Sequence, residues 1–139
     1  MWYKYPMDTN APPPRYDVLR ADCPARQILD RLADKWTILV VLALAPGTLR
    51  FSRLKAKVEG ISQKMLTQTL RRLERDGMVS RTVYATVPAT VEYRLTDLGA
   101  SLVDAFKVVR RWSHGHIDAI EAARQAYDAA EDRQPNTVY

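Results

Sequence analysis

The chain has few residues of the kinds that form covalent cross-links or metal centres. Its 139 residues include one cysteine, Cys23, and two histidines, His114 and His116. A single thiol cannot form an internal disulfide, and these residues are too few for a Cys-rich or His-based metal site. We therefore expect no metal, no cofactor and a reducing, cytoplasmic location.

Long hydrophobic runs are also lacking. The longest extends over eight residues, Ile38 to Ala45, whereas a membrane helix needs roughly 20. The first residues contain no apolar segment typical of a secretory signal, so no membrane partner is expected. Prolines predict an extended arm over residues 1–20 and a flexible tail over 131–139. A single domain over 21–130 remains.

Negative charge is scarce in the middle of the chain. Residues 50–94 hold ten basic and four acidic residues (+6), whereas the remainder holds eleven basic and twelve acidic residues (−1). Because the whole excess of +5 lies in this third of the sequence, a polyanion is the expected partner. From charge alone, a solvated helix face is the alternative.

Start and stop signals predict two N-terminal helices. Proline suits the first helical position, so Cys23-Pro24 predicts a helix start. Asp34 can cap a second helix over 36–45, which Pro46-Gly47 ends. This second helix is apolar nearly all round and is therefore expected in the middle of the core.

The next segments predict a helix-turn-helix followed by a hairpin. A short helix over 51–58 ends at Glu59-Gly60, and Ser62 can cap a longer helix that runs to Asp76 and stops at Gly77. Strand-like segments over 79–84 and 91–95 then form a two-stranded hairpin. This order is that of a winged helix.

The longer helix of the pair has two chemically distinct faces. At 100° per residue, Leu66, Leu70 and Leu73 fall in one narrow sector. The opposite side carries three cations and an amide, namely Lys64, Arg71, Arg75 and Gln68. Arginine can donate two hydrogen bonds to guanine and glutamine can pair with adenine, while Ser, Thr and Lys grip phosphates. The predicted DNA-binding residues are Arg50, Ser62, Gln63, Lys64, Thr67, Gln68, Arg71, Arg72, Arg81 and Tyr84.

Two other functions are alternatives to DNA binding, namely protein binding and thiol catalysis. A winged helix can bind another protein instead of DNA, since an ordinary amphipathic helix also has a polar outer face. A thiol enzyme would need a base near Cys23, and both histidines lie about ninety residues downstream. We therefore expect no enzyme activity and no catalytic residue.

The C-terminal segment is more apolar than one small domain can easily bury. Thr96 or Asp97 can cap a helix, and a further helical stretch over 117–127 follows a break at Gly115. A stripe wider than one core face indicates a homodimer, and packing on the chain's own domain is the alternative. A two-fold dimer would hold two recognition helices roughly 34 Å apart, matching a palindromic operator. The predicted interface residues are Phe106, Val109, Trp112, Ile117 and Ile120.

Cys23 stands where a helix dipole favours the reactive thiolate. Arg20 and Arg26 could add to this effect. The alternative is a small buried side chain, since cysteine is among the most buried residue types.

Several strings resemble the HxlR-type, MarR-like winged helix-turn-helix regulators, over about residues 23–113. They are Cys23-Pro24, Lys35-Trp36, Leu49-Arg50-Phe51, the run Gly60 to Leu70, the run Leu73 to Val79, the run Val91 to Thr96, Leu98-Gly99 and Trp112. The resemblance implies a mainly α fold with a small β-hairpin (α+β), flanked by N- and C-terminal dimerisation helices. It also implies dimers on inverted repeats that respond to an oxidant, an electrophile or a non-covalent small molecule, with Cys23 as a candidate sensor. Ala33-Asp34 departs from the glycine pair that members often have there.

Overall fold

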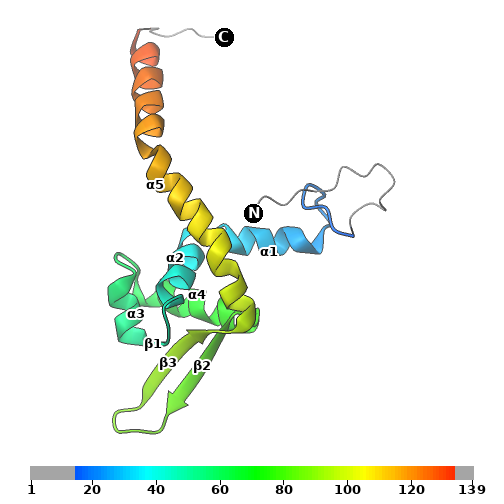
Figure 1. Ribbon diagram of the computed structural model, residues 1–139, viewed down its shortest axis with the longest axis vertical. Helices are drawn as coiled ribbons and strands as arrows, with labels where there is room; N and C mark the ends of the chain where they lie inside the picture. Colours follow the sequence, from blue (N-terminus) through cyan, green and yellow to red (C-terminus); the bar gives the residue numbers. More distant parts are fainter. Residues whose placement is uncertain (1–14, 134–139) are drawn as a thin grey trace.

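The computed structural model describes residues 15–133, which form five helices with a small sheet at one end (Figure 1). The elements in chain order are α1 (Pro24–Leu32), α2 (Lys35–Leu44), β1 (Leu49–Arg50), α3 (Phe51–Lys57), α4 (Gln63–Arg75), β2 (Val79–Tyr84), β3 (Thr90–Leu95) and α5 (Asp97–Asp132). Both the helix-turn-helix (α3 and α4) and the wing (β2 and β3) are present, and the mainly α fold is confirmed.

The helix starts are those that the polar residues predicted. The side chain of Asp34 accepts a hydrogen bond from Trp36 N at 3.4 Å, and Ser62 Oγ accepts one from Met65 N at 3.0 Å. Thr96 Oγ1 accepts from Gly99 N at 3.2 Å, so Thr96 and not Asp97 is the N-cap of α5. Each cap satisfies an amide that the helix itself leaves without a partner.

The sheet has one strand more than the sequence predicted. β1 pairs antiparallel with β3, with Leu49 opposite Tyr93 and Arg50 opposite Glu92, so the strand order is β1-β3-β2. A two-residue strand is too short to show the alternation by which strands are recognised. The expected hairpin is therefore corrected to a three-stranded sheet whose third strand ties the wing to the start of α3.

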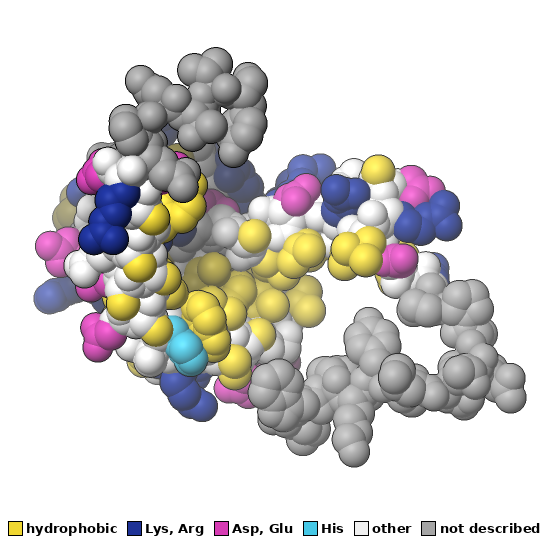
Figure 2. Space-filling view, turned by 90° about the horizontal axis from the view of Figure 1, so that it is seen from above, with side chains coloured by type: hydrophobic (Ala, Val, Ile, Leu, Met, Phe, Trp, Pro, Cys, Tyr) yellow, Lys and Arg dark blue, Asp and Glu magenta, His cyan; other side chains and the backbone are white. Residues whose placement is uncertain are grey.

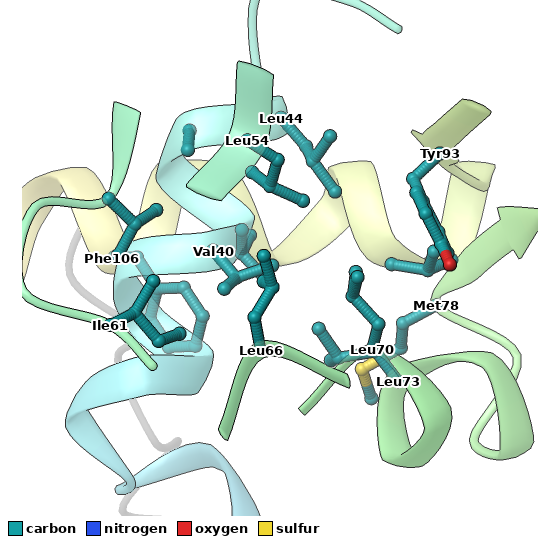
Figure 3. Packing of buried hydrophobic residues seen from close by; sticks show 14 of the residues in the cluster. Val40, Leu44, Leu54, Ile61, Leu66, Leu70, Leu73, Met78, Tyr93 and Phe106 are labelled. Atoms are coloured by element: carbon teal, nitrogen blue, oxygen red, sulfur yellow. The ribbon is translucent and has the colours of Figure 1, made fainter. Parts of the chain in front are cut away.

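The core forms around α2, as its apolar sequence predicted. Val40 and Leu44 of α2 meet Leu54 of α3 and Leu66 of α4, and all four are at most 1% exposed (Figure 3). Burying a side chain of this size contributes about 1.5–3 kcal/mol. The helix-turn-helix pair and the central helix therefore share one hydrophobic cluster.

The C-terminal helix differs from its prediction in two ways. α5 is continuous over 36 residues, without the break expected at Gly115. One glycine costs a helix only about 1 kcal/mol, and the backbone hydrogen bonds on either side persist. The helix also includes Glu131 and Asp132, which were assigned to the tail. Its second half projects away from the domain, opposite the wing (Figure 1).

Phe106 is corrected as well, because it is 6% exposed and packs into the core of its own domain (Figure 3). We leave it out of any interface between subunits. Most of the predicted arm and tail, residues 1–14 and 134–139, lies outside the described residues, and residues 15–20 form bends and turns. Over residues 15–133, no helix combines the length and the hydropathy needed to cross a membrane.

Gly99 lets the start of α5 approach the turn before β2. A Cβ at position 99 would overlap the backbone carbonyl oxygen of Met78, whereas one at Gly115 would meet nothing within 4 Å. We expect Gly99→Ala to lower the free energy of unfolding by about 1–3 kcal/mol, since the backbone must shift. We expect Gly115→Ala to raise it by about 0.5–1 kcal/mol. Urea unfolding of the two variants checks both, and equal values for the two would contradict this packing.

Candidate nucleic-acid interface

The buried face of α4 fixes the direction in which the helix presents its polar face. Leu66, Leu70 and Leu73 are at most 3% exposed and join the central cluster, as the helical spacing predicted. Thr69 is fully buried on the same face. Because a helix with this face anchored cannot turn about its axis, the residues on the other side keep a fixed orientation.

The outer face of α4 carries the predicted cations into solvent. Lys64, Arg71 and Arg75 are exposed, and Gln68 and Thr67 are half-buried beside them. Residues 64, 68, 71 and 75 follow each other at helical spacing, so they form one row along the helix. A row of donors of this kind can meet the acceptor edges of bases in a major groove.

An open groove of about 480 Å³ separates α4 from the wing. It is lined by Thr67, Leu70, Arg71, Glu74, Arg75, Arg81 and Tyr93. The wing supplies Arg81, whose Nε lies 3.9 Å from Glu74 Oε2 of α4, with both side chains about half exposed. Three guanidinium groups and one carboxylate therefore line the groove, which leaves it with a net positive charge suited to a phosphate.

Arg72 faces away from this groove. With Arg75 it lines a separate hollow of about 330 Å³ against α1, together with Asp30, Arg31 and Asp34. The structure therefore separates Arg72 from Arg71 and Arg81, with which it was grouped on the sequence.

The remaining predicted contacts lie at the ends of the interface. Arg50 is exposed at the N-cap of α3 and lies 3.9 Å from Glu92 of β3, so a phosphate there would compete with a carboxylate. Ser62 Oγ is occupied in capping α4, while Gln63 is exposed at its first position. Tyr84 is 45% exposed at the end of β2, toward the wing tip.

Cys23 is the N-cap residue of α1 and is 7% exposed, with its side chain making no capping hydrogen bond. It borders a hollow of about 450 Å³ that includes Arg15 and Arg20. Asp17 and Asp22 line the same hollow, and Arg20 Nε lies 3.3 Å from Asp22 Oδ1, so the two positive side chains beside the thiol are matched by two carboxylates.

Three residues near the site were not among the predicted site residues. Glu74 and Tyr93 line the groove, and Asp76 at the end of α4 accepts a hydrogen bond from Arg31 at 2.6 Å. Helical spacing places Glu74 on α4, but it does not predict which strand residues lie beside that helix in the folded chain. No local pattern pairs residues 31 and 76, which lie 45 positions apart.

Sequence relatives agree on one class of protein. A model of the HxlR-like helix-turn-helix family matches residues 31–121. The uncharacterized HTH-type transcriptional regulator YtfH of Escherichia coli K12 is 39% identical over 102 residues, which cover 73% of this chain and 81% of that protein. The uncharacterized regulator YdeP of Bacillus subtilis is 39% identical over 109 residues, covering 76% and 85%.

Solved structures give the same result. The transcriptional regulator YtfH of Salmonella typhimurium superposes with a TM-score of 0.74 at 37% identity, covering 79% of this chain and 98% of that one. The redox regulator HypR in its oxidized form gives 0.62 at 36%, covering 67% and 96%. Reduced YodB of B. subtilis gives 0.58 at 33%, covering 66% and 90%. With a helix-turn-helix and a wing bordering one basic groove, the chain belongs to the HxlR-like helix-turn-helix family of DNA-binding transcriptional regulators.

Proposed function

We propose that the protein is a homodimer that binds an inverted-repeat operator and thereby controls access to a promoter. The observation that carries this proposal is the basic row on α4, held by a buried leucine face beside a positively charged groove. The protein performs no chemistry on DNA. It acts by occupying a site.

Different parts of the proposed interface contact the bases and the DNA backbone. Arg71, Gln68 and Lys64 are positioned to enter the major groove, where donor patterns distinguish base pairs. Thr67 and Arg81 border the groove between α4 and the wing, where the DNA backbone would pass. Phosphate contacts fix the register of the protein on DNA, and base contacts select the sequence.

The dimer is supported by apolar side chains that the single chain leaves exposed. On α5, Val109 is 49% exposed, Trp112 56% and Ile117 45%. On α1, Ile28 and Leu29 are 41% and 49% exposed. These side chains belong to the two helices that border a concave, largely hydrophobic region (Figure 2). An apolar patch shared by two helices is typical of a subunit interface. Ile120, which is half-buried, extends the same stripe.

Control by an oxidant or electrophile at Cys23 is the proposed input. The solved relatives HypR and YodB include proteins described as redox regulators or treated with diamide. In this chain the thiol borders a hollow lined by two arginines and two aspartates, at the start of the helix α1 that contributes to the proposed dimer face. With one cysteine per chain, the product would be a disulfide between subunits, a mixed disulfide or a direct adduct.

A non-covalent ligand is the alternative input. An apolar groove of about 380 Å³ lies between α2 and α5, with Ile38, Leu39, Leu42 and Val109 among its lining residues. A protein-interaction module without DNA binding is the other alternative, and the salt dependence below separates it from the main proposal.

Sequence reading by α4 is tested with Arg71→Ala. We expect the variant to lose about 1–3 kcal/mol of binding free energy on DNA selected from a random library and to relax its preference at one base position. Arg81→Ala, which removes a proposed backbone contact, should weaken binding to all DNA about equally and reduce the salt slope by about one. Arg124→Ala on α5 removes the same charge far along the chain and serves as the control. Fluorescence anisotropy over a salt series measures these effects, and salt-independent binding would refute a DNA-binding role.

Dimerisation through α5 is tested with Trp112→Glu. We expect wild-type protein to sediment at twice the 15.9 kDa chain mass and the variant to sediment as a single chain, because a charge would be buried at the interface. Lys107→Glu introduces a charge of the same sign on the opposite side of the helix and should leave the dimer intact. A wild-type monomer at micromolar concentration would refute the dimer.

Sensing by Cys23 is tested with Cys23→Ser. Diamide should change the DNA affinity of the wild-type protein, and dithiothreitol should restore it. The variant should bind DNA like reduced wild type and ignore diamide, because serine forms no disulfide. An equal response of both proteins would exclude Cys23 as the sensor.

A further inference from the structure

The outward-pointing helix α1 is held to the domain by few contacts. No residue of Pro24–Leu32 is buried, and the helix packs against α2 rather than into the core. Leu32 at its end packs only partly against the hydrophobic cluster. The angle between α1 and the rest of the domain therefore depends on whatever polar contacts fix it.

One such contact joins α1 directly to the DNA-reading helix. Arg31 Nη1 donates to Asp76 Oδ1 at 2.6 Å, with the two side chains 38% and 18% exposed. Within residues 15–133 this is the one salt bridge between α1 and the α4 segment. It is shorter and less exposed than the ion pairs of Arg50 and Arg81, so solvent screens it less.

Arg31 offsets an electrostatic cost of placing a carboxylate at position 76. Asp76 is the C-cap of α4, where the negative end of the helix dipole disfavours a carboxylate. Arg31 lies in the last turn of α1, where the same effect favours a cation. The guanidinium therefore offsets the charge that Asp76 places at the end of α4. The adjoining hollow is also lined by groups of opposite charge. Asp30 of α1 and Asp34 before α2 lie in its lining with Arg72 and Arg75 of α4.

We propose that the Arg31–Asp76 pair is a positioning contact that sets the distance between the two recognition helices of the dimer, and so selects the spacing of operator half-sites. This inference rests on the proposed function, in which α1 contributes to the subunit interface. If α1 packs against the second copy, its angle to α4 decides where each α4 lies relative to the two-fold axis. An intact Arg31–Asp76 pair then permits one half-site spacing. Without the pair, each α4 can change its distance from the two-fold axis.

The test compares duplexes that differ only in spacing. The probes are the inverted repeat selected by wild-type protein, the same repeat with one or two base pairs inserted or deleted at its centre, and a duplex with one half-site. Arg31→Met and Asp76→Asn are compared with Arg26→Met, which removes an equal charge from α1.

We expect each pair variant to lose about 5- to 30-fold in affinity for the selected spacing, a range typical of coupling between sites. Affinity for a single half-site should stay within about twofold, because one α4 needs no spacing. The double variant should be no weaker than the weaker single variant, as for residues that act through each other. Arg26→Met should keep the wild-type spacing profile.

Two results would overturn the inference alone. One is an unchanged spacing profile in the pair variants beside a sharp profile in wild type. The other is an equal loss on half-site and full-site DNA, which would indicate mere destabilisation of α4. A wild-type protein with no spacing preference would refute the proposed function and this inference together. Should Arg31→Met fail to fold, Asp76→Asn, which keeps the size and shape of the side chain, provides the same comparison.

Discussion

The rest of the structure depends on the burial of one face of α4. Leu66, Leu70 and Leu73 lock this helix against α2, so the row of Lys64, Gln68 and Arg71 is held outward. Without that anchor the cations would be ordinary surface charges with no common direction. Buried apolar area thus supplies the orientation of the exposed polar groups that we propose contact DNA.

The same division of roles extends to the wing. β1 pairs with β3, which fixes the sheet to the start of α3, and this places Arg81 beside α4 across the groove. The wing therefore contributes one of the three arginines that line this groove. Glu74, which lines that groove 3.9 Å from Arg81, offsets part of its positive charge.

Local rules predicted the features that depend on local chemistry. The caps Asp34 and Ser62, the stop at Gly77 and the buried leucines of α4 all follow from spacing and hydrogen-bonding capacity, and all are confirmed. Apart from the break expected at Gly115 and the C-terminal end of α5, the predictions that were wrong and the features that were missed depend on contacts between distant segments. β1 exists because β3 offers it a partner, and Phe106 is buried because the core reaches it. The contact of Arg31 with Asp76 and the groove beside Arg81 likewise arise from tertiary packing, so no sequence window reveals them.

The central claim is that DNA lies along the outer face of α4 and against the wing. Backbone-amide chemical-shift mapping during titration with the selected duplex tests it most directly, because every described residue except proline reports its own surroundings. The account predicts that the largest changes fall on residues 62–75 and on β2 around Arg81, with the distal half of α5 unchanged. Changes concentrated on the apolar stripe of α5, with α4 silent, would contradict it.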